Sequence, residues 1–349
     1  MPSADTIDDV RRDALNGIAL VFCPVGTQNM KMSGAHAEPA AAGEWEREIV
    51  RAAPTDVPAL AKVIRGCAPD FVVVDPFLLT SSTLAAVHVE GVPYALLWAN
   101  LIGVAPKWLR TFRKGTDEAM QDMLSKFGVD WSDAFASPRS RILNMAPVVP
   151  ELIGGEVAGI HLVGFPGSPE RRGDEVDFDS STLPASPFVY VSFGSMLEHP
   201  ALLEIIFRAT RRLGLRVVAS VGRLVAELGD CGDHVVLARY VPQREVLQRA
   251  SLFVTHGGYN SVAEGLRAGT PMLVVPLLFD QPIQAHYVTE TGAGLALPPT
   301  ELTEDSAAEA LSALSTEASY RAQATRFARL AASTDPTETK VNLILRFCA

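Results

Sequence analysis

The chain has 349 residues, of which 48% are hydrophobic and 20% charged, which suits about two domains with a sizeable core in each. Its formal net charge of −10 argues against nucleic acid as a partner. No apolar run reaches the roughly 18 residues of a membrane-spanning helix, and no signal-peptide pattern opens the chain, so we expect a cytoplasmic protein without membrane insertion.

The first half of the chain predicts an α/β domain. Strands are expected near residues 18–23, 71–75 and 93–97, and a helical stretch over about 104–128 is expected to line one side of a cleft. Asp75 directly follows the second of these strands, in FVVVDPF. It either caps the following helix or turn, or is a functional carboxylate at a strand end.

A linker is expected between two α/β halves. Residues 164–187 are rich in Pro, Gly, Ser and Asp. This composition predicts a first domain over 1–165, a linker over 166–186 and a second domain over 187–335. The apolar segment over 336–349 is expected to pack back on the first domain.

Five expected strands in the second half each end in glycine or polar residues. They cover residues 188–192, 216–219, 235–238, 251–255 and 272–275. In an open parallel sheet ligands bind beyond the carboxyl ends of the strands, so these polar ends should meet at one edge.

The turn His256-Gly257-Gly258 leads from a strand into a helix expected to begin near residue 260 or 261 and to end at Gly269-Thr270-Pro271. Glycines let a ligand approach the backbone, and the first turn of a helix offers free N–H groups and a positive dipole end to an anion such as a diphosphate. Alternatively, Ser261 and Glu264 form only a capping box, S-x-x-E. Capping and binding are compatible.

A longer pattern surrounds this turn. Residues 240–281 read YVPQ(x3)L(x5)F(x2)HGG(x)NS(x2)E(x4)G(x)P(x4)P(x3)DQ, which resembles the donor-binding signature of the UDP-glycosyltransferase superfamily, and in particular bacterial natural-product and macrolide-type glycosyltransferases. VYVSFGS before it and PDFVVVDPF in the first half extend the resemblance. It implies an inverting enzyme of α/β class with the GT-B fold: two Rossmann-like doubly wound domains facing a cleft, the N-terminal one incomplete.

The resemblance also implies residue roles. The backbone at Val241 and Gln243 would frame uracil or thymine, and Tyr240, where the family normally has Trp, would stack on the base. Glu264 would accept hydrogen bonds from ribose hydroxyls. Asp280 and Gln281 would bind hydroxyls of the sugar, with Gln284 as the nearest substitute for an Asn that often follows this pair. The diphosphate would be held by residues of the turns and the helix start: Ser195, His256, Gly257, Gly258, Asn260 and Ser261.

The family's general base has no counterpart that we can identify. Residues 1–26 resemble the part that follows the second strand in relatives, so the first two strands and the catalytic His are expected to be missing. Asp75 matches the carboxylate that orients this His. The histidines outside the signature do not match the base position: His36, His88, His161, His199, His234 and His286.

The leading hypothesis is transfer of a hexose or deoxyhexose from a UDP- or dTDP-sugar to a hydroxyl of a small acceptor, such as a polyketide or phenol, with inversion. The alternative is a catalytically impaired or non-catalytic nucleotide-sugar-binding protein or partner subunit. A GT-B nucleotide-sugar epimerase is disfavoured because such enzymes lack the signature over 240–281. No cofactor is expected. No metal is expected either, because a helix dipole with N–H donors can stabilise a leaving diphosphate.

Overall fold

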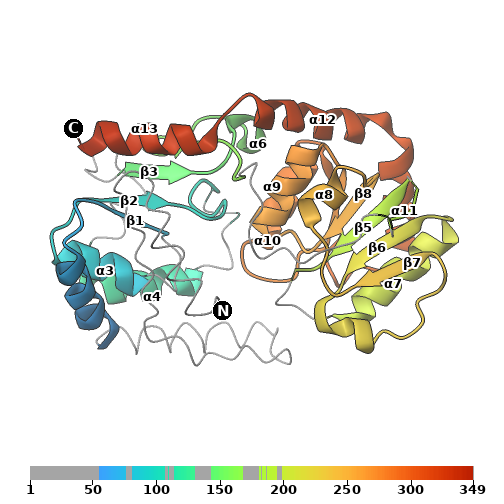
Figure 1. The fold of residues 1–349 in the computed structure, drawn as a ribbon, viewed down its shortest axis with the longest axis horizontal. Helices are drawn as coiled ribbons and strands as arrows, with labels where there is room; N and C mark the ends of the chain where they lie inside the picture. Colours follow the sequence, from blue (N-terminus) through green and yellow to red (C-terminus); the bar gives the residue numbers. More distant parts are fainter. Residues whose placement is uncertain are drawn as a thin grey trace.

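The computed structural model describes residues 55–75, 81–106, 109, 114–129, 143–167, 181, 183–185, 187–194 and 199–348. Two parallel sheets lie side by side, each with its own helices (Figure 1). We call them the four-stranded unit and the six-stranded unit. The predicted strand over 18–23, Ser195 and most of the predicted linker over 166–186 lie outside the described residues.

The six-stranded sheet has the strand order β10-β9-β8-β5-β6-β7, and all its neighbouring strands run parallel. Its strands are β5 (Phe188–Ser192), β6 (Arg216–Ser220), β7 (Val235–Ala238), β8 (Leu252–Thr255), β9 (Met272–Val274) and β10 (Gly294–Ala296). The chain first builds β5, β6 and β7 in one direction and then returns to add β8 on the other side of β5. The order therefore reverses between β5 and β8.

Helices cover both faces of this sheet. Val189 and Val191 of β5 share an apolar core with α7 (Pro200–Arg212) and α11 (Glu304–Thr316). Phe188 and Tyr190 face the other core, formed with α8 (Gln243–Leu247), α9 (Tyr259–Ala268), α10 (Gln281–Glu290) and α12 (Ala318–Ala332). A short 3-10 helix covers Gly222–Ala226. Because both faces are buried, β5 reads as a continuous apolar run, as parallel strands typically do.

The four-stranded unit has the order β1-β2-β3-β4, also parallel. A helix over residues 55–67 precedes the sheet. The other elements are β1 (Val72–Val74), α3 (Ser81–Val89), β2 (Tyr94–Leu97), α4 (Lys114–Ser125), β3 (Leu143–Ala146), α6 (Pro150–Ile153) and β4 (His161–Leu162).

The last helix joins the two units. Figure 1 shows α12 beside the six-stranded unit running into α13 (Pro336–Cys348), which lies along β3 of the four-stranded unit. Leu343 and Ile344 of α13 pack against the buried side chains of Leu143 and Met145. The last helix is thereby part of the apolar core beside β3 of the four-stranded unit.

Most predicted strands are found with a shift of at most one residue at an end. Within the helical stretch predicted over 104–128, the described residues form α4 over Lys114–Ser125, whereas residues 101–105 form turns and bends. The strands β3, β4 and β10 were not predicted. The last two are only two and three residues long.

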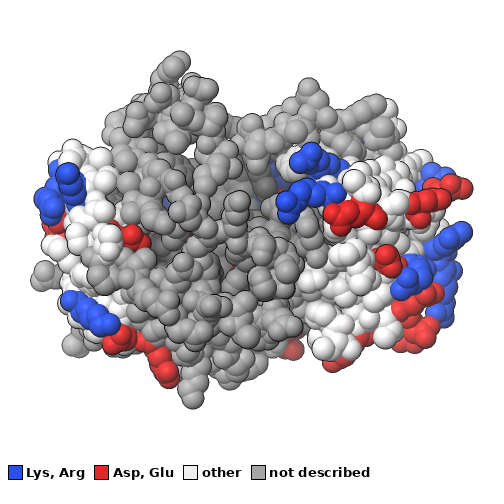
Figure 2. All heavy atoms as spheres, turned by 90° about the horizontal axis from the view of Figure 1, so that it is seen from below, with Lys and Arg blue, Asp and Glu red and all other residues white. Residues whose placement is uncertain are grey.

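The described surface carries mixed charge. In the view of Figure 2, Lys and Arg side chains lie among Asp and Glu side chains rather than in a separate patch. The basic residues of α7 form exposed ion pairs: Arg208 contacts Glu204 and Glu304, and Arg212 contacts Asp305. Among the described residues, no helix is long and apolar enough to cross a membrane.

Candidate functional site

The predicted donor residues gather where the strand order of the six-stranded sheet reverses. β5 and β8 are neighbours up to their carboxyl ends, where Ser192 pairs with Thr255. The two loops that leave this edge carry Gly194 and His256. Open α/β sheets bind ligands at such a reversal point, so the fold itself places these loops at a binding edge.

His256 lies between two glycines of these loops. A Cβ atom placed on Gly258 would lie 2.6 Å from its Nε2 atom, and one on Gly194 would lie 3.0 Å from its Cε1 atom. Only glycine at both positions leaves room for the ring without displacement. The imidazole is therefore fixed beside the start of α9 by close packing.

Burial lowers the pKa of His256 to about 4, although the nearby Ser192 backbone raises it somewhat. Its Nδ1 atom is buried and has no hydrogen-bond partner of good geometry among the described residues. The ring is thus neutral near pH 7. A neutral imidazole can donate one N–H to an anion.

The helix α9 begins one residue earlier than the predicted range, at Tyr259, with Gly258 as its N-cap and no side-chain cap. Ser261 is therefore the third helical residue rather than the N-cap. The alternative that Ser261 and Glu264 form a capping box is wrong, because Glu264 contacts α8 instead. The first turn of α9 follows directly from the loop beyond β8, and the N–H groups of a first helical turn have no partner within the helix. The helix ends at Gly269, as predicted, and this glycine has a φ of 70°.

Gln243 at the start of α8 contacts two predicted ligand residues of α9. Its Nε2 atom donates to Oε2 of Glu264 at 2.7 Å and lies 3.4 Å from Oγ of Ser261. Glu264 is only 7% exposed, and its carboxylate is satisfied in part by this amide. The structure thus brings Gln243, Ser261 and Glu264 into one polar group.

Asp280 and Gln281 lie at the start of α10, but their side chains have different hydrogen-bond partners. Oε1 of Gln281 accepts hydrogen bonds from the backbone N–H groups of Leu277 and Leu278, at 2.7 and 2.8 Å. Gln281 therefore shapes the loop before α10, and its carbonyl oxygen is engaged. Asp280 accepts a hydrogen bond from Gln284, the residue predicted as a substitute for the family's Asn.

Asp75 lies at the carboxyl end of β1, in the four-stranded unit. Its Oδ1 atom is 3.4 Å from the backbone N–H of Ala99, beyond the end of β2. Burial raises the pKa of its carboxyl above the ordinary value, the Ala99 hydrogen bond opposes this, and the charge of Asp280 adds to the increase. The charge of Asp280 in the six-stranded unit is thus near enough to act on Asp75 in the four-stranded unit.

The remaining predicted residues lie around the same edge. Tyr240 is half-buried after β7, Val241 is buried, and Asn260 is exposed on the first turn of α9.

Two tyrosines near the site were not predicted from the sequence. Tyr190 of β5 contacts Gln243, and Tyr259 donates a hydrogen bond to the Pro147 carbonyl of the four-stranded unit. The available signals were a tyrosine in the middle of a predicted apolar strand and another between Gly257-Gly258 and Asn260-Ser261.

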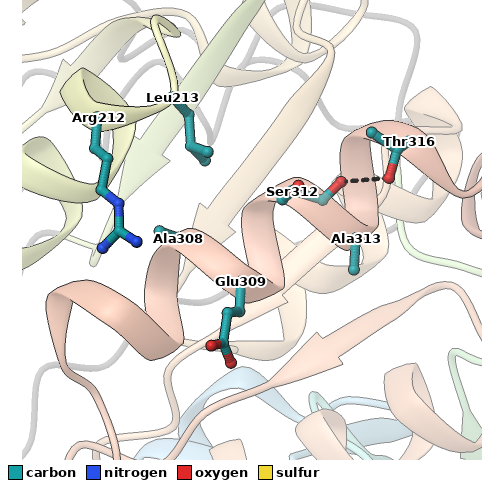
Figure 3. A pocket seen from close by; sticks show the side chains of 7 residues that line it. All are labelled: Arg212, Leu213, Ala308, Glu309, Ser312, Ala313 and Thr316. Carbon is teal, nitrogen blue, oxygen red and sulfur yellow. Dashed lines mark hydrogen bonds between the residues drawn. The ribbon is translucent and has the colours of Figure 1, made fainter.

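A surface pocket lies elsewhere, between the end of α7 and α11 (Figure 3). Its lining includes Arg212, Glu309 and Ser312, and none of the predicted site residues. α7 and α11 cover the opposite sheet face from α9. Within the described ranges, no group of three or more His, Cys, Asp or Glu side chains is placed to hold a metal ion.

Comparison with known proteins gives related matches. Residues 210–346 match the family model described as erythromycin biosynthesis protein CIII-like, C-terminal domain. The chain is 35% identical over 134 residues to the NDP-glycosyltransferase YjiC of Bacillus subtilis (strain 168), covering 38% of this chain and 34% of the relative. It is 31% identical over 270 residues to the oleandomycin glycosyltransferase of Streptomyces antibioticus, covering 71% and 61%. The chain thus spans about a third to three fifths of these two relatives.

Solved structures show the same architecture. The calicheamicin glycosyltransferase CalG4 matches with a TM-score of 0.68 and 21% identity, over 89% of this chain and 81% of that one. The glycosyltransferase VinC in complex with dTDP matches with a TM-score of 0.68 and 21% identity, over 97% and 89%. The resemblance to natural-product glycosyltransferases and the GT-B fold, both predicted from the sequence, are confirmed.

Proposed function

We propose that this chain binds a UDP- or dTDP-hexose or deoxyhexose and transfers the sugar, with inversion, to a hydroxyl of a small acceptor such as a polyketide or phenol. The arrangement at the start of α9 carries this proposal. The first-turn N–H groups and the Glu264 carboxylate belong to α9, and the neutral His256 ring lies in the loop just before this helix, at the reversal point of the sheet. Donors at the helix start would suit a diphosphate, and a carboxylate further along the helix would suit a ribose.

Each part of the donor would have a partner. The first turn of α9 and the N–H of His256 would stabilise the negative charge that develops on the leaving diphosphate. Glu264 would accept ribose hydroxyls, while Tyr240 and the backbone at Val241 would contact the base. Asp280 would contact the sugar. We propose no metal or cofactor, because these groups supply the required positive ends and donors.

The acceptor would bind on the side of the four-stranded unit. The charge of Asp280 acts on Asp75 across the two units, so an acceptor beside Asp75 would lie near a sugar held by Asp280. Attack on the face of the sugar opposite the leaving diphosphate would invert the anomeric carbon. We further propose domains over 1–165 and 187–335, a linker over 166–186, and 336–349 as the helix that returns to the first domain.

Calorimetric titration with UDP, UDP-glucose and dTDP-glucose tests donor binding, and mass spectrometry of mixtures with phenols and polyketide-like alcohols tests transfer. We expect His256→Ala to lose most nucleotide affinity. His161→Ala is the control, because His161 is exposed on β4 of the other unit.

The outcomes separate the candidate functions. Binding with glycoside formation supports the proposal. Binding without glycoside formation supports a nucleotide-sugar-binding protein instead. Epimerised donor in the absence of acceptor would indicate an epimerase, and no binding by the unaltered protein would contradict all three.

A further inference from the structure

Tyr190 is a buried tyrosine at the middle of the central strand β5. Its side chain is 1% exposed, and its ring stacks on Phe253 of β8, with ring centroids 5.1 Å apart and planes 10° apart. This packing fixes the direction of the phenol hydroxyl. A buried hydroxyl also needs a hydrogen-bond partner.

The hydroxyl finds that partner in the side chain of Gln243. Tyr190 donates to Oε1 of Gln243 at 3.2 Å, and Nε2 of the same amide donates to Glu264 at 2.7 Å. The two ends of the amide are not interchangeable here. Turning the amide over would place its oxygen against the Glu264 carboxylate, two acceptors without a proton between them.

The chain of contacts thus runs from a sheet strand through α8 to a carboxylate on α9. We propose that Tyr190 and the side chain of Gln243 are positioning residues, which hold the Glu264 carboxylate in the orientation that receives the nucleoside hydroxyls of the donor. This inference rests on the proposed function. It assigns to the Gln243 side chain a role separate from the backbone contact with the base.

The inference predicts that the effect of Tyr190 depends on the ribose hydroxyls of the ligand. Tyr190→Phe keeps the ring and its stacking on Phe253 but removes the hydroxyl. We expect it to weaken UDP binding about 3- to 10-fold, as loss of one buried hydrogen bond would. Binding of 2′,3′-dideoxyuridine diphosphate, which lacks both ribose hydroxyls, should not change.

Calorimetry on the full chain measures the affinities for UDP and for the dideoxy nucleotide. The variants are Tyr190→Phe, Gln243→Met, Glu264→Gln and the double variant Tyr190→Phe/Glu264→Gln. Tyr94→Phe is the matched control, because Tyr94 is also a buried tyrosine in a strand but belongs to the four-stranded unit. We expect the double variant to bind UDP no more weakly than Glu264→Gln alone, since the tyrosine acts through the carboxylate. Gln243→Met should behave as Tyr190→Phe does, with a larger loss.

Three results would overturn the inference. One is equal weakening of UDP and the dideoxy nucleotide by Tyr190→Phe, which would indicate general loosening of the site. Another is a fully additive loss in the double variant. The third is an unchanged UDP affinity in Tyr190→Phe and Gln243→Met together with weak UDP binding by Glu264→Gln. This result would overturn the positioning role but leave the proposed function intact. If the unaltered protein bound neither UDP nor dTDP, the proposed function would fail together with this inference.

Discussion

Burial of His256 should make the stability of the protein depend on pH. The pKa of this residue falls from 6.5 to about 4 on folding. Between these values the unfolded chain binds a proton that the folded chain does not, so the free energy of unfolding decreases as the pH drops. Over the whole window this lowers the free energy of unfolding by about 3 kcal/mol. We expect His256→Asn to lose less stability than the unaltered protein across this window, measured by urea denaturation at several pH values.

His161→Asn is the control for the removal of an imidazole, because His161 is exposed. Its stability should follow that of the unaltered protein throughout the acid range. Parallel curves for His256→Asn and the unaltered protein would show that the folded protein accommodates a charged ring at this position. Burial of His256 would then not exclude the charged form of its ring.

The sequence predicted which residues lie near one another better than it predicted which groups their side chains contact. Ser261 and Glu264 suggested a capping box, but the helix begins at Tyr259, and Glu264 turns to Gln243. Gln281 suggested a sugar ligand, yet its oxygen holds two backbone N–H groups of its own loop. Such choices depend on which donors the fold brings within about 3 Å, and residue spacing alone does not contain that information.

The junction between β8 and α9 should be intolerant of any side chain at Gly258. A Cβ atom there would lie 2.6 Å from Nε2 of His256, so Gly258→Ala must displace the ring or the start of the helix. Either displacement moves the donors proposed to hold the diphosphate. We expect UDP affinity to fall by about tenfold or more, equivalent to about 1.4 kcal/mol or more. Calorimetric titration with UDP measures this effect.

Gly66→Ala provides the matched comparison. A Cβ atom at Gly66 would have no neighbour within 4 Å, and the residue lies in the helix over 55–67. Since alanine favours helix over glycine by about 1 kcal/mol, this variant should be as stable as the unaltered protein or more so, with the same UDP affinity. If Gly258→Ala bound UDP as tightly as Gly66→Ala does, the packing of His256 against the glycine would not matter for binding.

Strands that coincide with a clear apolar run were predicted, whereas β3, β4 and β10 were missed. β5 and β7 were predicted at the same residues at which they are found: β5 reads Phe-Val-Tyr-Val-Ser, and β7 begins with two valines in an apolar run. β10 reads Gly-Leu-Ala and β4 reads His-Leu, so neither carries a strand signal of its own. Both are strands because a neighbour supplies the hydrogen bonds: β9 pairs with β10, and β3 pairs with β4.

The two units of the molecule are connected close to the candidate site. The phenol of Tyr259, the first residue of α9, donates to the Pro147 carbonyl just beyond β3. The side chain is 4% exposed, and burial raises the pKa of Tyr259 above the ordinary value of a phenol. The hydroxyl therefore remains a donor across the range in which the protein is folded. The helix start proposed to bind the diphosphate is thus tied to the unit proposed to bind the acceptor.

Tyr259→Phe should separate donor binding from transfer. The variant keeps the buried ring and loses the hydrogen bond between the units, which leaves the Pro147 carbonyl without this donor and costs about 1–2 kcal/mol of stability. UDP affinity should stay close to that of the unaltered protein, because the N–H groups of α9 remain. Turnover at saturating donor should fall, because donor and acceptor sides are no longer held in one fixed relation.

The comparison of the UDP dissociation constant with kcat decides whether this connection serves catalysis or only folding. Tyr94→Phe removes the hydroxyl of a buried tyrosine in the four-stranded unit and leaves the contact between the units intact, so its kcat should be unchanged. A loss of stability in Tyr259→Phe with unchanged kcat would assign the hydrogen bond to folding alone. Loss of UDP affinity in proportion to kcat would instead show that it shapes the donor site. Only a fall in kcat at constant affinity fits a connection that sets the relative placement of the two substrates, because placement contributes to the reaction step and not to binding of the nucleotide.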